Sequence, residues 1–148
     1  MRLKKQSDYA LRVLMYLAAN NREISTVKDI ALFFDISQNH LMKVVQGLSH
    51  LGYVRTVRGK NGGIWLDQPT EAINIGAVLR QVGEENELAE CFVEHSQCRI
   101  ERVCKLKQIL RQANDAFFAV LDEFSLADIL ASPSTLEALL VPSDLSAV

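Results

Sequence analysis

The sequence has no long hydrophobic run and little cysteine. Among its 148 residues, no stretch reaches the roughly 20 apolar residues that cross a bilayer, and the first eight residues lack the apolar core of a secretory signal. We therefore expect a cytoplasmic protein without a membrane partner, in which thiols stay reduced. Three cysteines cannot all pair in disulfides, and there is neither a Cys-x-x-Cys motif nor a base placed beside a nucleophile. The sequence accordingly predicts a protein that is not an enzyme.

The small net charge of -2 hides a marked difference between the two halves of the chain. Up to Trp65 there are ten Lys or Arg residues and four Asp or Glu, a formal charge of +6, whereas the remainder carries -8. A basic half beside an acidic half predicts that the first part meets a polyanion; ordinary solvated surface charge is the alternative. With 49% hydrophobic residues, a chain of this length can bury a core without a metal.

Apolar residues at helical spacing predict three helices in the first part of the chain. Ser7, Thr26 and Ser37 stand at positions typical of N-caps, and Thr26 with Asp29 resembles a capping box. The last two helices are joined by a short turn, which is the spacing of a helix-turn-helix. The three helices are expected over residues 8–19, 27–34 and 38–51.

The polar face of the third expected helix has the chemistry of a DNA-reading surface. Asn and Gln side chains can bond adenine through two atoms, and Lys can reach guanine or phosphate in the major groove. A polar helix face without a ligand is the alternative. The candidate reading residues are Ser37, Gln38, Asn39, His40 and Lys43.

A β-hairpin is predicted directly after this helix. Gly52 ends the helix, residues 53–58 and 64–66 have the composition of strands, and Asn61-Gly62 is a strong turn signal between them. A helix-turn-helix followed by a basic hairpin is a winged helix, whose wing meets phosphate or the minor groove. A P-loop is disfavoured because its Lys-Ser/Thr element ahead of a helix is missing. The candidate wing residues are Arg55, Arg58, Lys60 and Asn61.

A long apolar stripe, from about Val103 to Phe124, dominates the second half of the chain. Before it we expect a helix capped by Asn74 and ending near Val82, then an acidic connection that holds the cysteines. The same helix of a second copy is the expected partner of the stripe, with burial inside one subunit as the alternative.

The predicted fold is mainly α with a small β-hairpin, a winged helix-turn-helix plus a long dimerisation helix. After the stripe, Ser125 with Asp128 resembles a further capping box. The expected parts are a winged-helix DNA-binding domain over residues 1–82, a cysteine-bearing cluster-binding loop over 83–103, the dimerisation helix and C-terminal helices over 104–141, and a flexible tail over 142–148.

All three cysteines, Cys91, Cys98 and Cys104, lie within fourteen residues of sequence. Thiolates so spaced can hold an iron-sulfur centre or a zinc ion, because both accept soft ligands. His95 is the candidate additional ligand from the same stretch. A metal site on a DNA-binding chain predicts that the metal group controls DNA binding.

Six short motifs combine in this chain: SDYALR at 7–12, NHLMKV at 39–44, GYV at 52–54, RGKNGGI at 58–64, IG at 75–76 and CKLKQ at 104–108. Together they resemble the Rrf family of bacterial transcription regulators, over roughly residues 1–140. The resemblance implies a homodimeric repressor that binds double-stranded operator DNA, with nitric oxide as effector in the branch that looks most similar. It also implies an iron-sulfur cluster held by Cys91, Cys98 and Cys104, 4Fe-4S in preference to 2Fe-2S, with Asp8 of the partner subunit as fourth ligand.

The chain departs from one branch of that family at Lys107, where the branch has a His ligand three residues after its last cysteine. This difference argues against that branch's ligand set. His95 remains the competitor of Asp8 for the fourth position. A regulator that senses iron-sulfur status or general redox stress, or one that holds a structural zinc, remains the alternative function.

Overall fold

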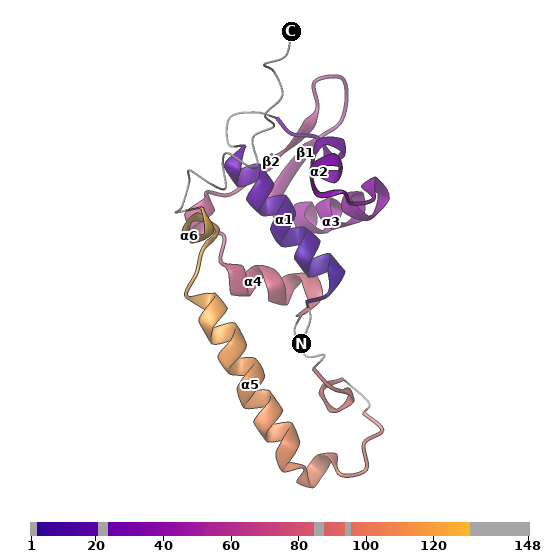
Figure 1. Ribbon diagram of the computed structural model, residues 1–148, viewed down its shortest axis with the longest axis vertical. Helices are drawn as coiled ribbons and strands as arrows, with labels where there is room; N and C mark the ends of the chain where they lie inside the picture. Colours follow the sequence, from indigo (N-terminus) through magenta and orange to yellow (C-terminus); the bar gives the residue numbers. More distant parts are fainter. Residues whose placement is uncertain (1–2, 21–23, 85–87, 94–95, 131–148) are drawn as a thin grey trace.

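Three helices and a hairpin form the upper body of the molecule, and one long helix leads away from it (Figure 1). The computed structural model describes residues 3–20, 24–84, 88–93 and 96–130. The predicted class, mainly α with one small hairpin, is confirmed. The helices are α1 (Lys5–Ala19), α2 (Val27–Phe34), α3 (Gln38–His50), α4 (Ile75–Leu79), α5 (Lys105–Asp122) and α6 (Leu126–Ile129), and the strands are β1 (Val54–Val57) and β2 (Gly63–Leu66).

Helix α1 begins earlier than its capping signal indicated. Ser7 was the expected N-cap, but it lies inside the helix, fully buried, and Lys4 takes the N-cap position. The Lys4 ammonium donates to the Gly83 carbonyl oxygen at 2.6 Å, so a long-range contact fixes this helix end. Ser7 faces the core beside Ala10 and Leu14, because apolar packing on one face of α1 outweighs the preference of serine for a helix end.

The helix-turn-helix is formed by α2 and α3. Thr26 and Asp29 make the predicted capping box, with the Asp29 amide donating to Thr26 Oγ1 at 3.1 Å. Asp35 ends α2 in the left-handed region, at φ 51°, and Ser37 precedes α3 without a side-chain capping bond. Leu41 and Leu48 of α3 are fully buried in the common core, so the opposite face of α3 points outward.

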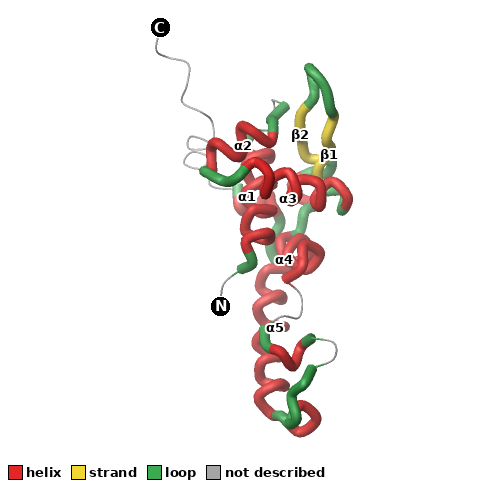
Figure 2. The backbone as a smooth tube through the Cα atoms, turned by 90° about the vertical axis from the view of Figure 1, so that its right-hand side faces the viewer, coloured by secondary structure: helices red, strands yellow, loops and turns green. Residues whose placement is uncertain are grey.

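The hairpin is an antiparallel pair of β1 and β2, in which Val54 lies opposite Leu66. Ser25 adds a single bridge on the outer side of β2, since the Ile64 amide donates to the Ser25 carbonyl at 2.7 Å. A Cβ atom at Gly63 would lie 1.9 Å from Ile24 Cγ2, so this close approach requires glycine. The base of the hairpin is therefore part of the body, while its tip projects from the top (Figure 2).

Helix α4 is shorter than predicted. Asn74 caps it as expected, accepting from the Ala77 amide at 2.9 Å, but the α-helix ends at Leu79. The chain continues through a π-helical turn, Arg80–Glu84, in which Gly83 has φ 103°. A left-handed residue cannot continue a helix, and glycine adopts this conformation without a steric cost.

The end of α5 is anchored to α4, and the rest of the helix extends below the body (Figures 1 and 2). Arg80 holds the Asp122 carboxylate with two bonds of 2.6 and 2.7 Å, and its guanidinium stacks over the Phe118 ring at 4.5 Å. The Asn74 side chain donates to the Asp122 carbonyl at 2.7 Å. Arg80, Asn74 and Asp122, with Phe118, are called here the α4–α5 clamp.

Ser125 and Asp128 form the second predicted capping box, at the start of α6. The predicted helix after Pro133 and the tail 142–148 lie outside the described residues. No helix in the described part of the chain is long and apolar enough to cross a membrane.

Candidate DNA-reading surface and cysteine centre

The residues predicted to read DNA lie on the solvent-exposed side of α3 and at its N-cap, Ser37. Because the apolar residues of α3 are buried, its polar residues are turned to solvent. A helix with one buried stripe and a polar outer face fits the width of the major groove. Ser37, Gln38, Asn39, His40 and Lys43 are all exposed.

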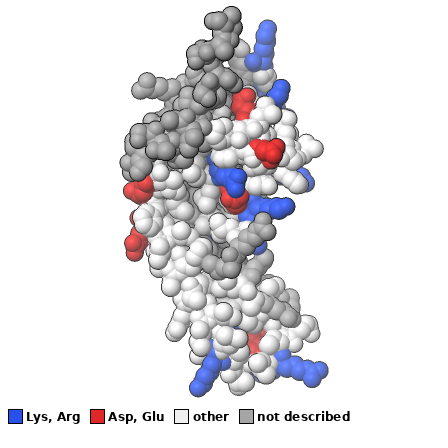
Figure 3. Space-filling view, viewed as in Figure 1, with Lys and Arg blue, Asp and Glu red and all other residues white. Residues whose placement is uncertain are grey.

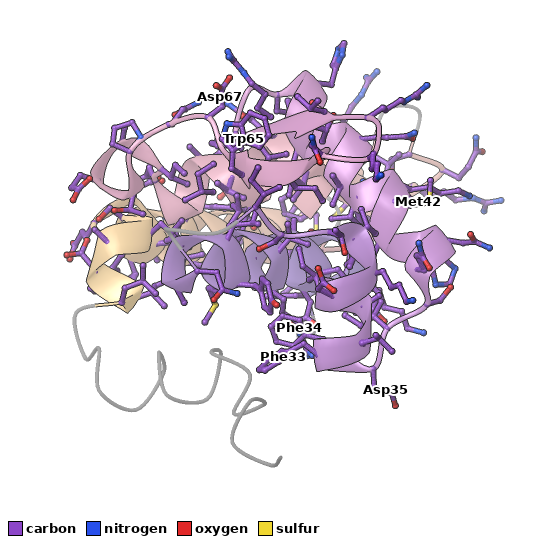
Figure 4. The ribbon with its side chains drawn as sticks, turned by 90° about the horizontal axis from the view of Figure 1, so that it is seen from above. Phe33, Phe34, Asp35, Met42, Trp65 and Asp67 are labelled. Carbon is purple, nitrogen blue, oxygen red and sulfur yellow. The ribbon has the colours of Figure 1, made fainter. Side chains whose placement is uncertain are left out.

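Met42 also belongs to this face, and it was absent from the predicted set. Its side chain is 44% exposed and stands on the outer side of α3 (Figure 4). It lies three residues after Asn39 and four after Gln38, which places the three on one side of the helix. This spacing is the signal in the sequence that could have identified it. A thioether can contact a thymine methyl group, which polar side chains do not favour.

The hairpin presents basic side chains at two levels. Arg58, Lys60 and Asn61 lie in and beside its exposed tip. Arg55 lies nearer the base, where its Nε is 3.1 Å from an Asp67 carboxylate oxygen, and Figure 4 shows Asp67 at the edge of the hairpin. Arg55 therefore shares its charge with Asp67, and the tip is the more strongly cationic part of the wing.

Basic side chains gather over the upper right of the molecule, where α3 and the hairpin lie (Figure 3). The lower surface over α5 shows few charged groups in the same view, apart from basic groups and an acidic group near its end. The part of the chain that was predicted to meet a polyanion thus carries exposed basic side chains on its reading helix and hairpin. A polyanion is attracted to the body.

The cysteine segment, residues 88–104, is described over 88–93 and 96–104, and these parts contain two single-turn 3-10 helices, Glu90–Phe92 and Glu101–Val103. Cys91, Cys98 and Cys104 are free thiols and half-buried, and Cys104 is the N-cap of α5. The segment buries little apolar surface, since Val93, Ile100 and Val103 are exposed. Packing alone therefore does not order it.

Glu101 is the centre of a hydrogen-bond network in this segment. Its carboxylate accepts from the Lys107 ammonium of α5 and from the Ser96 hydroxyl, and these two bonds hold the pKa of Glu101 below its ordinary value. The Ser96 oxygen in turn accepts from the Cys98 amide at 3.2 Å. Lys107 lies three residues after Cys104 and is engaged in an ion pair with Glu101.

Asp8 lies on α1, half-buried, and its carboxylate is 2.9 Å from the Arg12 guanidinium. His95, the predicted competitor for the fourth ligand position, lies outside the described residues. No group of three or more His, Cys, Asp and Glu side chains is within reach of one metal ion in the described ranges of a single chain.

The donor set nevertheless fits an iron-sulfur cluster in its chemistry. Thiolates are the ligands of such clusters, and three free thiols on one segment leave one position for a ligand from elsewhere. Half-burial leaves the thiols accessible to iron. A tetrahedral zinc site makes the same use of three thiolates and one further ligand.

One face of α5 is apolar and exposed. Phe118 is 3% exposed and packs toward α4, whereas the opposite face of the helix is without a cover among the described residues. The predicted stripe thus divides into a buried side at Phe118 and an exposed side that spans about 21 Å of helix. The large residues of the exposed side are Leu106, Ile109 and Val120, each 57–60% exposed, and Phe124, which is 46% exposed, follows the end of the helix.

Comparison with known proteins places this architecture in a family. The model of the Rrf2 family, described as "Iron-dependent Transcriptional regulator", matches residues 3–132. The chain is 45% identical to the helix-turn-helix-type transcriptional regulator NsrR of Bacillus licheniformis over 142 residues, which cover 95% of this chain and 99% of that one. It is 44% identical to NsrR of Bacillus subtilis over 142 residues, covering 95% and 97%.

Solved structures agree with this result. CymR, the global cysteine regulator of B. subtilis, matches 90% of this chain and 99% of its own, with a TM-score of 0.68 and 25% identity. IscR of T. potens matches 100% and 94%, with a TM-score of 0.70, and at 21% identity it supports the fold alone. The winged-helix fold and the extent of these matches show that the chain belongs to the Rrf2 family of transcriptional regulators.

Proposed function

We propose that this protein is a dimeric DNA-binding transcriptional repressor whose iron-sulfur cluster senses nitric oxide. The observation that carries the proposal is the joint presence, in one short chain, of an exposed reading helix and a segment with three free thiols. The relatives named NsrR match 95% of this chain, and this supports a regulator in which both parts act together. The proposed site of action is the cytoplasm.

Binding of DNA is assigned to α3 and to the tip of the hairpin. Asn39, His40 and Lys43 would meet base edges in the major groove, with Ser37 and Gln38 at the start of the helix. Arg58 and Lys60 would meet phosphates or the adjacent minor groove. Two such reading surfaces in a dimer would recognise two half-sites of an operator.

Dimer formation is assigned to the exposed face of α5. The large apolar residues on this face would be covered by the same face of a second copy, as a two-fold interface requires. An exposed apolar stripe of this length on a soluble helix marks an interaction surface.

The cluster ligands are assigned to Cys91, Cys98 and Cys104 of one chain and Asp8 of the second copy. We take 4Fe-4S in preference to 2Fe-2S, and nitric oxide would act by binding the cluster iron. In this chain Asp8 is held by Arg12 on α1, so recruiting its carboxylate to a metal would alter an ion pair within the DNA-binding body. Cluster binding and DNA binding are thereby coupled through α1.

A second candidate is a regulator that holds zinc or responds to iron-sulfur status or redox stress. Three thiolates with one oxygen or nitrogen ligand satisfy tetrahedral zinc, and the free thiols of this segment favour such a site equally in chemical terms. The two candidates differ in colour, in sulfide content and in their response to nitric oxide.

Anaerobic purification separates them. Iron and acid-labile sulfide are measured, and binding to a duplex selected from random DNA by the anaerobic protein is followed during titration with nitric oxide. We expect brown protein, release of the duplex by nitric oxide, and neither colour nor release for Cys98→Ser. A colourless protein that contains zinc and keeps its duplex in nitric oxide would contradict the proposal.

A further inference from the structure

We propose that Glu101 is a positioning residue, which ties the Cys98–Cys104 part of the cysteine segment to α5 through Lys107 before any metal is bound. The role of the segment in metal binding rests on the proposed function, whereas the ordering of the metal-free segment does not. Glu101 is not offered as a metal ligand, because its carboxylate is already held by Lys107 and Ser96.

The backbone of Glu101 is bonded to both flanking cysteines. Its amide donates to the Cys98 carbonyl oxygen at 3.3 Å, and its carbonyl oxygen accepts from the Cys104 amide at 3.5 Å. Glu101 lies three residues from each, so these bonds close one turn on either side of it. The backbone positions of Cys98 and Cys104 relative to each other are therefore fixed by the turns on either side of Glu101.

The side chain of Glu101 secures that turn to the rest of the protein. Lys107 comes from the first turn of α5, and the two side chains are only 19% and 33% exposed for Lys107 and Glu101. A charge-assisted bond between partly buried groups is stronger than a fully solvated ion pair. Through Ser96, which accepts from the Cys98 amide, the network also holds the chain just before Cys98.

Apolar packing adds little to the order of this part of the segment among the described residues. Ile100 is 59% exposed and Val103 81% exposed, so apolar burial contributes little. A site whose ligands are held near one another before binding loses less chain entropy when the metal arrives. Glu101 and Lys107 therefore act on the affinity and lifetime of a bound metal group without contacting it.

The first test is hydrogen–deuterium exchange on the metal-free, reduced protein. Glu101→Ala should accelerate exchange of the Glu101 and Cys104 amides by about tenfold or more, the factor expected when a charge-assisted bond is lost. Lys107→Gln should accelerate the same amides by a smaller factor, because the Ser96 bond to Glu101 remains. The double variant should add little to Glu101→Ala, since the bond between Lys107 and Glu101 is already lost in that variant. Lys105→Gln is the matched control, because this exposed lysine lies two residues away on α5, and it should leave exchange unchanged.

Exchanging the charges, with Glu101→Lys and Lys107→Glu in one chain, should restore much of the lost protection, whereas either reversal alone should not. Protection that is unaffected by Glu101→Ala, or equally reduced by Lys105→Gln, would overturn the inference. A parallel measurement on metal-loaded protein should show faster loss of metal to a chelator in Glu101→Ala. Because the exchange test uses metal-free protein, it remains decisive even if the chain binds zinc or no cluster at all.

Discussion

Removing one apolar side chain from the exposed face of α5 should weaken the dimer while leaving the protomer folded. Ile109 is 59% exposed in the isolated chain. Full burial of an isoleucine side chain contributes about 1.5–3 kcal/mol, so covering the exposed part contributes about 1–2 kcal/mol in each copy. The alanine side chain still buries part of this apolar surface and favours the helical conformation, so the loss in each copy is smaller than this figure. The substitution is present in both copies of the dimer, so the loss counts twice. We therefore expect Ile109→Ala to cost the dimer about 2 kcal/mol, or about a 30-fold increase in its Kd.

Sedimentation equilibrium over a range of protein concentrations measures this Kd directly. Gln108→Ala is the matched control, because Gln108 is exposed and adjacent but lies off the apolar face. The control should dimerise as the unmodified chain does, and the melting temperature of dilute Ile109→Ala protein should be nearly unchanged. An unaltered Kd for Ile109→Ala, or an equal loss in both variants, would refute the assignment of this face to the dimer.

Two further predictions concern DNA binding and the α4–α5 clamp. Lys60→Ala should weaken binding to all duplexes alike and reduce the slope of log K against log salt concentration by about 1. Asn39→Ala should instead change the preference for one base position by about 1–3 kcal/mol. Identical effects of the two variants in binding titrations would contradict the assignment of these residues. The clamp lowers the pKa of Asp122 below the ordinary 3.8 through its bonds with Arg80. The ion pair of Asp122 with Arg80 therefore stabilises the folded protein fully above the pKa of Asp122 in the unfolded chain. This stabilisation is lost as the pH falls through the lower pKa of Asp122 in the folded protein. Asp122→Asn should therefore melt below the unmodified protein at pH 7, with a gap that narrows toward pH 3; a constant gap would exclude this coupling.

The elements that could be predicted from the sequence are those whose signals are local. The capping boxes at Thr26 and Ser125 depend on residues three apart, and both helices begin where these boxes indicated. The hairpin likewise follows from a glycine turn between β-branched segments. Ser7 has an equally good local signal, but it is buried in the core, and the N-cap is Lys4, which contacts Gly83, seventy-nine residues away. A contact between residues so far apart in the sequence cannot be predicted from the residues around Ser7.

The candidate sites also contain features that local sequence signals predict and features that depend on long-range contacts. The outward residues of α3 follow from helical periodicity, so the predicted reading residues lie on one exposed face. The pairing of Arg55 with Asp67 and of Glu101 with Lys107 depends on side-chain directions that spacing alone does not specify. The ligand role of Asp8 stays a prediction, because it involves two chains. Met42 was overlooked since an apolar residue on a polar face gives no charge or amide signal.

The α4–α5 clamp gives the long helix the mechanics of a lever. The helix is fixed to the body at Asp122, while Cys104 lies at its opposite end, about 27 Å away. By this geometry, a rotation of about 10° at the clamp moves the cysteine end by about 5 Å, roughly one helical turn. In the reverse direction, a displacement of about 5 Å at the thiols would correspond to a rotation of only about 10° at the clamp.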